Sequence, residues 1–249
     1  MGASWKQALI IGASSGMGEA LARQLAQQGC QVALVARRKE ELERLAGEIR
    51  AAGGTAHCYP HDVREAECIP ALFQQICRDL GGLDLVIYAS GVMPPVEPDE
   101  YAFDKDRLMV EVNLLGAIAW LNEAAQRFER AGTGTIVGIS SVAGDRGRRG
   151  MPVYGATKAA LNAYLESVRN RIGRFGVSVV TIKPGPVDTP MTRGSGKSLP
   201  LLIPAEKAAT LILSAARSRK NVAYVPGAWR VIMFIVRNIP SFIFKKMNF

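Results

Sequence analysis

Short apolar runs alternate with longer amphipathic stretches along most of the chain. Apolar runs of roughly four to eight residues are typical of strands that are buried on both faces of a parallel sheet. The helical stretches between them indicate crossover helices. Seven strands are predicted, at residues 7–11, 31–36, 55–59, 83–88, 134–140, 177–183 and 221–225. The alternation therefore predicts an α/β protein with a doubly wound parallel sheet and helices on both faces.

The length of the chain fits one such unit. It has 249 residues, of which 48% are apolar, and this is enough for a single sizeable core. Neither an internal repeat nor a low-complexity linker divides the sequence. We therefore predict one domain over residues 1–228, followed by an amphipathic C-terminal tail over residues 229–249.

A glycine-rich turn follows the first predicted strand. The apolar run that ends at Ile11 leads into Gly12, Gly16 and Gly18, and a helical pattern begins at Glu19. A strand, a glycine turn and a helix in this order place a pyrophosphate at the helix N-terminus. The spacing Gly-x-x-x-Gly-x-Gly differs from the commoner Gly-x-Gly-x-x-Gly. A cluster of glycines alone is also explained by a tight turn.

Tyr154 and Lys158 lie four residues apart on a predicted helix, and Ser141 precedes them. Side chains at i and i+4 share one helix face. A lysine ammonium there is expected to lower the tyrosine pKa from about 10 toward neutrality, which suits general acid–base catalysis. Ser141 supplies a hydroxyl that can hold a substrate carbonyl. Taken alone, the Tyr–Lys pair is better explained as chance surface neighbours, so its meaning depends on the glycine turn.

Together with that turn, the chain resembles the short-chain dehydrogenase/reductase family over nearly its whole length. The motifs that carry the resemblance are Gly12-Ala13-Ser14-Ser15-Gly16-Met17-Gly18, Asp62-Val63, Ala89-Ser90-Gly91, Asn113, Ser140-Ser141, Tyr154-x-x-x-Lys158, and Pro184-Gly185 running to Thr189. One departure is Ala89-Ser90-Gly91, which stands where the family usually has Asn-Ala-Gly. This departure concerns local strand packing rather than the chemistry.

The resemblance implies a Rossmann-type fold and a catalytic tetrad of Asn113, Ser141, Tyr154 and Lys158. It also implies that Asp62 faces the adenine of a dinucleotide, that residues 89–91 line the cofactor, and that the loop 184–189 holds the nicotinamide amide. Asn113 is expected to hold a water beside Lys158 and so to connect the site to solvent.

Two arginines directly after the second predicted strand bear on the choice of cofactor. NAD-binding folds place an acidic residue near this point, whereas an arginine accommodates the 2′-phosphate of NADP. Cations are also disfavoured at a helix N-terminus, so the presence of Arg37 and Arg38 at the start of the following helix favours a functional contact over solvated charge. We predict NADP(H), with Arg37 as the main contact and Ser14 or Arg38 assisting. The predicted cofactor-binding residues are Gly12, Ser14, Ser15, Gly16, Met17, Gly18, Arg37, Arg38, Asp62, Val63, Ala89, Ser90, Gly91, Tyr154, Lys158, Pro184, Gly185, Val187 and Thr189.

A second basic segment, Asp145-Arg146-Gly147-Arg148-Arg149-Gly150, lies between Ser141 and Tyr154. Chain connectivity places it near the mouth of the site. Its arginines could grip a phosphate or carboxylate of a substrate. They are equally well explained by a salt bridge to Asp145 within the loop and by solvated charge.

The C-terminal tail is both apolar and basic. Its residues at helical spacing form one stripe, Trp229, Ile232, Met233, Val236 and Ile239. The stripe is widened by Val231, Phe234 and Ile235, and Arg230, Arg237 and Asn238 form the polar side. Pro240 interrupts the helix before Phe242, Ile243, Phe244, Lys245, Lys246 and Phe249. The segment is too short and interrupted to span a bilayer, but it fits the membrane interface. A lid over the substrate pocket or a contact with a partner subunit would explain it as well.

Composition narrows the remaining possibilities. The net charge is +9, but basic and aromatic residues do not interleave outside the tail, so a nucleic-acid partner is not predicted. Cys30, Cys58, Cys68 and Cys77 form no Cys-x-x-Cys pair and are predicted to be buried or half-buried free thiols. Strand alternation would split His57, Cys58 and His61 between two faces, so no metal site is predicted. Because no cleavable signal precedes the first strand, we expect a cytoplasmic protein, peripheral on the inner face of the cell membrane if the tail binds lipid.

The leading interpretation is an NADP(H)-dependent oxidoreductase that reduces a carbonyl or oxidises an alcohol. The basic loop and the tail resemble those of a subgroup of the family that includes the reductase of a polyprenyl-phosphate-linked 2-keto-ribose. This implies a lipid-linked or lipophilic anionic substrate. The alternatives are a reductase of soluble ketones or 3-oxoacyl thioesters, and a non-catalytic NADP(H)-binding regulatory protein. The family resemblance also implies a homodimer or homotetramer that pairs through the helices around 104–130 and 152–174.

Overall fold

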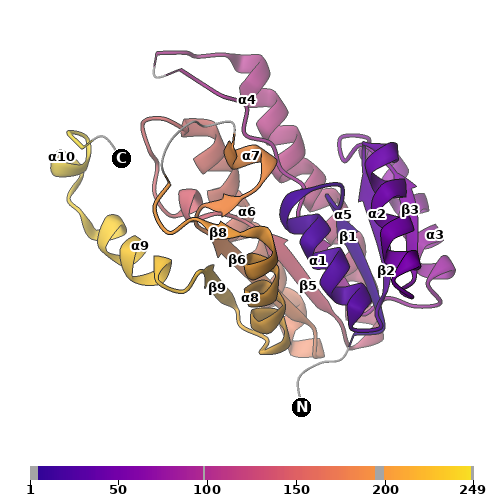
Figure 1. Ribbon diagram of the computed structural model, residues 1–249. Helices are drawn as coiled ribbons and strands as arrows, with labels where there is room; N and C mark the ends of the chain where they lie inside the picture. The colour runs from indigo at the N-terminus through magenta and orange to yellow at the C-terminus, as the bar shows by residue number, and fades with distance from the viewer. Residues whose placement is uncertain (1–4, 98, 194–198, 248–249) are drawn as a thin grey trace.

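A computed structural model of the chain describes residues 5–97, 99–193 and 199–247. A parallel sheet of seven strands runs through the middle of the molecule in the order β3-β2-β1-β4-β5-β6-β9 (Figure 1). The strands are β1 (Gln7–Ile11), β2 (Gln31–Ala36), β3 (Ala56–Pro60), β4 (Leu85–Tyr88), β5 (Thr135–Ile139), β6 (Ser178–Pro184) and β9 (Val222–Val225). All seven predicted strands are confirmed; two have the predicted ends, and the ends of the others differ by at most two residues. A second small sheet pairs β7 (Val187–Asp188) with β8 (Ile203–Pro204).

Helices cover both faces of the large sheet. The helices are α1 (Gly16–Gln27), α2 (Lys39–Ala51), α3 (Ile69–Asp79), α4 (Phe103–Val110), α5 (Gly116–Ala131), α6 (Pro152–Ile172), α7 (Pro190–Arg193), α8 (Ala205–Arg217), α9 (Trp229–Asn238) and α10 (Ser241–Phe244). The core on one face contains buried side chains of α1, α2 and α8, and the core on the other contains those of α3, α5 and α6. The prediction of a doubly wound α/β sheet is therefore confirmed.

The strand order reverses between β1 and β4, which both pair in parallel with their neighbours. In doubly wound sheets, ligands bind beyond the carboxyl ends of the strands at such a switch point. The backbone N–H of Ala89, directly after β4, donates to the carbonyl of Ile11 at the end of β1 (2.7 Å). The two chain segments that carry predicted cofactor residues are therefore joined at this point.

The longest helical stretch runs from α4 through a π-helical turn at Glu111–Leu115 into α5. By length and composition, residues 103–131 form the one helix in the described parts of the chain that could cross a membrane. Its apolar side chains Ala117, Trp120, Leu121, Ala124 and Phe128 are buried in the core of the sheet, which is the packing of an ordinary core helix.

The tail follows β9, the strand at the edge of the sheet, and lies on the side of the molecule away from α2 and α3 (Figure 1). Trp229, Met233 and Val236 of α9 are buried, and the helix ends before Pro240, as the sequence predicted. Phe249 and residues 1–4 lie outside the described residues.

The four cysteines are free, as predicted, but Cys68 is exposed rather than buried or half-buried. It belongs to a one-turn 3₁₀ helix, Ala66–Cys68, that has no buried residue. Cys58 donates its thiol hydrogen to the carbonyl of Leu42, while the ring of His61 packs edge-on against Trp120.

Candidate active site

The glycine-rich turn between β1 and α1 is packed too tightly for side chains. Gly12 has a φ of +94°, and a Cβ there would lie 2.5 Å from the backbone nitrogen of Ser90. A Cβ on Gly18 would lie 2.1 Å from the carbonyl oxygen of Gly12. Glycine is therefore required at both positions by the close approach of backbone, as a dinucleotide turn demands.

The N-terminus of α1 carries groups suited to a phosphate. Ser15 occupies the N-cap position, and its side chain makes no capping hydrogen bond to the helix. The first N–H groups of a helix and its dipole favour an anion at such an end. The guanidinium of Arg38 donates to the hydroxyls of Ser14 (2.8 Å) and Ser15 (2.7 Å). A fixed cation thus lies beside this helix end.

The two arginines after β2 point to different neighbours. Arg37 is more than half exposed, and its guanidinium lies 4.0 Å from the carboxylate of Asp62. The side chain of Arg64 makes three closer hydrogen bonds to the same carboxylate, and these chiefly hold the pKa of Asp62 below its ordinary value. Arg38, which the sequence placed in an assisting role, is the arginine that reaches the glycine turn.

Asn113 is fully buried within the π-helical turn. Turns of this kind often lie at functional sites. Its side-chain amide accepts a hydrogen bond from Val92 N (2.7 Å) and donates to Val92 O (2.9 Å). Tyr88, at the end of β4, donates its hydroxyl hydrogen to the carbonyl of Val112 (2.6 Å). The π turn and the loop after β4 are thereby fixed to each other.

The other three tetrad residues follow β5 or lie on α6. Ser141 is the second residue after the end of β5. Its Oγ accepts a hydrogen bond from the backbone N–H of Ala143 (3.0 Å). Lys158 is buried on α6 and donates from Nζ to the carbonyl of Ile139 (3.0 Å). A Cβ on Gly91 would lie 3.4 Å from Asn113 Oδ1 and 3.7 Å from Lys158 Nζ, so these residues converge.

The predicted direction of the Tyr154 pKa is wrong for the protein by itself. Burial raises the pKa of Tyr154, and a hydrogen bond with Ser141 and the charge of Arg148 oppose this only in part. Burial also lowers the pKa of Lys158 to about 8. The lysine Nζ lies 5.8 Å from the centre of the Tyr154 ring and is directed to the Ile139 carbonyl. Desolvation therefore outweighs the i,i+4 charge effect, and Tyr154 holds its proton at neutral pH.

The loop after β6 closes the site from the other side. A Cβ on Gly16 would lie 3.0 Å from the side chain of Thr189, which joins this loop to the glycine turn. Gly185 lies directly beneath the indole of Trp229, because a Cβ there would lie 2.0 Å from Trp229 Nε1. The first residue of the tail helix therefore packs on the loop that was predicted to hold the nicotinamide.

The carboxylate of Asp145 in the arginine loop is hydrogen-bonded to two side chains of the sheet. Asp145 accepts from Lys183 Nζ on β6 (2.5 Å) and from the Tyr224 hydroxyl on β9 (2.6 Å). Arg146 donates to the carbonyls of Val236 (2.5 Å) and Ile239 (2.6 Å) at the end of α9. A cation is favourable at a helix C-terminus, so Arg146 fastens the tail rather than a substrate.

Arg148 is the arginine of this loop nearest the tetrad. Its Nη2 lies 3.7 Å from the sulfur of Met233 on α9. Its charge opposes the rise that burial causes in the pKa of Tyr154. Apolar side chains also surround Tyr154, namely Met109, Ala143, Val92, Met93, Met151 and Val153. The surroundings of the phenol thus combine an apolar wall with the cationic side chains of Arg148 and Lys158.

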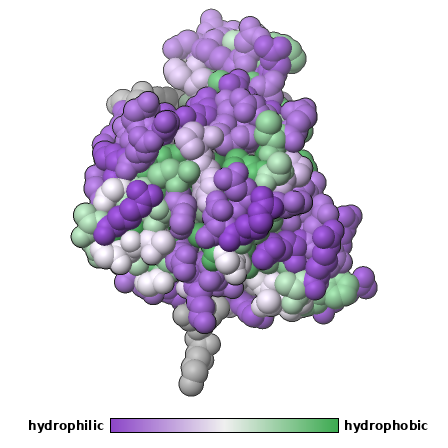
Figure 2. All heavy atoms as spheres, turned by 90° about the vertical axis from the view of Figure 1, so that its right-hand side faces the viewer, coloured by the Kyte–Doolittle hydropathy of each residue, from purple (hydrophilic) through white to green (hydrophobic). Residues whose placement is uncertain are grey.

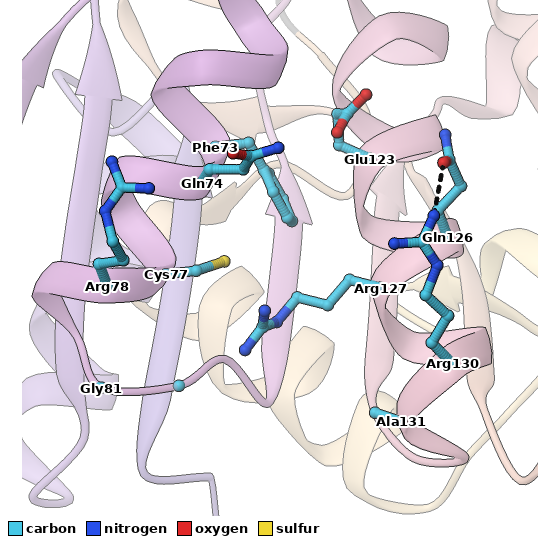
Figure 3. A pocket seen from close by; sticks show the side chains of 11 residues that line it. Phe73, Gln74, Cys77, Arg78, Gly81, Glu123, Gln126, Arg127, Arg130 and Ala131 are labelled. Atoms are coloured by element: carbon cyan, nitrogen blue, oxygen red, sulfur yellow. Dashed lines mark hydrogen bonds between the residues drawn. The ribbon is translucent and has the colours of Figure 1, made fainter.

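A large groove lies elsewhere, between α3 and α5 (Figure 3). It has a volume of about 840 Å³, and Arg78, Arg127 and Arg130 line it together with Phe73 and Cys77. These residues lie toward the C-terminal ends of α3 and α5, which lead into the amino ends of β4 and β5. The groove is therefore at the opposite end of the sheet from Ser141, which follows the carboxyl end of β5.

The fold and the convergence of Asn113, Ser141, Tyr154 and Lys158 beside a glycine turn define an oxidoreductase of the dinucleotide-binding α/β class. Residues 6–199 match the family described as short chain dehydrogenase, and the chain belongs to this family.

Comparisons with individual proteins agree with this assignment. The chain is 34% identical over 209 residues to an uncharacterized oxidoreductase of Myxococcus xanthus, covering 84% of this chain and 83% of that protein. It is 33% identical over 190 residues to one of Staphylococcus epidermidis, covering 76% and 81%.

Solved structures are similar over most of the chain. A short-chain dehydrogenase/reductase of Mycobacterium ulcerans superposes with a TM-score of 0.80 at 25% identity, covering 88% of this chain and 87% of that one. A short-chain dehydrogenase of Sphingobium yanoikuyae in complex with NADPH gives 0.81 at 25% identity, covering 94% and 96%.

Proposed function

We propose that the protein is an NADP(H)-dependent oxidoreductase that reduces a carbonyl group, with Tyr154 as the general acid. The observation that carries this proposal is the convergence of Asn113, Ser141, Tyr154 and Lys158 next to a glycine turn. This turn is packed too closely against neighbouring backbone to hold side chains at Gly12 and Gly18. The Sphingobium relative of known structure binds NADPH, and Arg38 beside the α1 N-terminus suits a 2′-phosphate.

The residues divide the work of the reaction among them. When bound, the nicotinamide cofactor supplies the hydride. Ser141 holds the substrate oxygen by its hydroxyl, and Tyr154 delivers its proton to that oxygen. The raised pKa of Tyr154 keeps this proton in place at neutral pH, so the residue enters the reaction as an acid. Lys158 lies beside the phenol and Asn113 lies near Lys158 at Gly91, so the two residues could return a proton from solvent to Tyr154.

The choice between NADP(H) and NAD(H) is expected to depend on Arg38 more than on Arg37. The Arg38→Ala variant should bind NADPH roughly ten- to a hundredfold more weakly, because a hydrogen bond to a charged group is typically worth about 1.5–3 kcal/mol. Its affinity for NADH should change little. Titration of both cofactors against both single alanine variants measures the effect. Equal affinity of the unmodified protein for NADH and NADPH would contradict the assignment.

The substrate we propose is lipophilic and anionic, with a lipid-linked keto-sugar phosphate as one member of this class. This is supported by Arg148 close to Tyr154 and by the apolar residues around the phenol. The rival substrates are soluble ketones and 3-oxoacyl thioesters, which would leave Arg148 without a role in recognition.

Replacing Arg148 by Gln should separate these substrates. We expect kcat/KM to fall by roughly ten- to a hundredfold for a carbonyl compound that bears a phosphate or carboxylate, and to change little for a neutral ketone. Arg149→Gln, an exposed neighbour in the same loop, is the matched control. An equal loss on both kinds of substrate would show that Arg148 acts on the tetrad and not on substrate charge.

We also propose that the chain pairs with a second copy through the helices around 104–130 and 152–174. Phe103 and Leu115 on the first of these stretches are exposed large apolar side chains, at 73% and 54% of their full area. Burial of such residues in a homodimer or homotetramer would remove them from water.

A further inference from the structure

The tail presents a group of exposed apolar side chains on a folded support. We define the tail face as Val231, Phe234, Ile235, Phe242 and Ile243, which are 44% to 71% exposed. By contrast, the face that carries α2 and α3 is mostly hydrophilic, with smaller apolar areas between the polar side chains (Figure 2). Clusters of exposed apolar residues mark interaction sites, so the tail face needs an occupant.

The tail face is held in place by the inner side of α9. Trp229, Met233 and Val236 are buried, and they pack with Val142 next to the catalytic Ser141. Arg146 closes the C-terminal end of α9, and its guanidinium also stacks 3.8 Å above the ring of Phe244 in α10. One side of α9 therefore packs on the loops beside Ser141 and Gly185, and the other side faces outward.

The charge around the tail face indicates what the occupant is. After Glu206 the sequence contains eight lysines and arginines and no aspartate or glutamate. Four of these cations belong to the tail, Arg230, Arg237, Lys245 and Lys246, and all four are exposed. A two-fold contact between copies pairs the same patch with itself. On this face it would bring cations against cations with no carboxylate of the segment to offset them.

We propose that the tail face is a membrane-docking surface that binds anionic lipid. Its aromatic and aliphatic side chains would enter the interface region, while the surrounding cations bind the headgroups. Because Val142 and Trp229 connect α9 to the loops beside Ser141 and Gly185, docking would set the mouth of the site at the bilayer surface. This proposal is independent of the hydride chemistry and does not rest on it.

Sedimentation with lipid vesicles tests the proposal on the full chain. The protein should bind vesicles of equal parts phosphatidylglycerol and phosphatidylcholine and bind pure phosphatidylcholine only weakly. Binding should weaken as salt rises, because screening reduces the charge contribution. The Phe234→Ser/Ile235→Ser variant should bind at least about tenfold more weakly. The Lys245→Glu/Lys246→Glu variant should lose roughly fivefold or more for each cation.

Matched controls change exposed residues elsewhere. Leu211→Ser on α8 and Lys6→Glu/Lys220→Glu near the amino ends of the strands lie outside the proposed pairing helices, and these variants should bind vesicles like the unmodified protein. Thermal unfolding of each variant checks that the fold is intact, and NADPH oxidation with a soluble carbonyl, without vesicles, reports separately on the proposed activity. Absence of binding to anionic vesicles at low salt would overturn the proposal. So would tail variants that bind as the unmodified protein does, or that change the oligomeric state without changing vesicle binding.

Discussion

Replacing Tyr154 by Phe is expected to lower turnover by at least roughly a hundredfold, the usual scale of general acid catalysis. The substitution removes the hydroxyl that gives its proton to the substrate oxygen but keeps the buried ring in its place. The affinity for NADPH should stay within a few-fold of the unmodified protein. Steady-state turnover and cofactor titration measure the two quantities separately.

The control for this variant is the same substitution on the same helix. Tyr164 also lies on α6, but its hydroxyl donates to Asn122 on α5 (2.9 Å), away from the tetrad. Tyr164→Phe should therefore leave turnover nearly unchanged. If Tyr154→Phe retained activity within a few-fold of the unmodified protein, the phenol could not be the acid.

The second large effect is expected on stability, from the buried pair of Asp145 and Lys183. Their side chains are only 2% and 11% exposed, and Tyr224 donates its hydroxyl hydrogen to the same carboxylate. Asp145→Asn leaves the Lys183 ammonium buried without its counter-charge. Breaking a buried pair in this way typically costs about 3–5 kcal/mol, so the free energy of unfolding measured in denaturant should fall by that order.

Two further variants separate this pair from ion pairs in general. Asp188 and Arg193 form a pair at the surface, with side chains 41% and 69% exposed, and Asp188→Asn should change stability little. Asp145→Asn combined with Lys183→Met removes the unpaired charge and should recover most of the loss. A double variant as unstable as the single one would mean that the carboxylate, and not its charge balance with Lys183, matters.

The fold and the tetrad could be predicted because their signals are local. The seven apolar runs are each long enough to form a strand, and the spacing of Tyr154 and Lys158 on a helix is fixed by the helical repeat. Gly18 is also predictable, since it lies against the carbonyl of Gly12 within the same short turn, and Gly12 has a positive φ there; the contact of Gly12 with the backbone of Ser90 is visible only in the fold. The glycine turn and Ser141 lie on the same side of the molecule because β1 and β5 are parallel and both end at the carboxyl end of the sheet.

The contacts that could not be predicted join segments that are distant in sequence, often through backbone atoms. Arg146 binds carbonyl groups some ninety residues away, and carbonyls leave no mark in the sequence. Lys183 and Asp145 are brought together only by the register of β6 against the loop after β5. The π turn around Asn113 is held by the hydroxyl of Tyr88, which donates to the carbonyl of Val112. In the sequence, Tyr88 can be recognised only as a residue of a predicted strand.

The pKa of Tyr154 was predicted in the wrong direction for a related reason. The sequence shows that a lysine lies four residues away, but not that both side chains are buried or that Lys158 is directed to the Ile139 carbonyl. Burial is a property of the whole assembly of helices and sheet, and here it outweighs the neighbouring charge.

The most direct test of the proposed function follows the hydride itself. NADPH that carries deuterium at the transferred position of its nicotinamide should be oxidised in the presence of a carbonyl substrate, with deuterium appearing on the former carbonyl carbon of the alcohol product. The same mixture with the Tyr154→Phe variant should form product at least roughly a hundredfold more slowly. Tight NADPH binding without any oxidation, across neutral and anionic aldehydes and ketones, would contradict the proposal and favour a non-catalytic NADP(H)-binding protein.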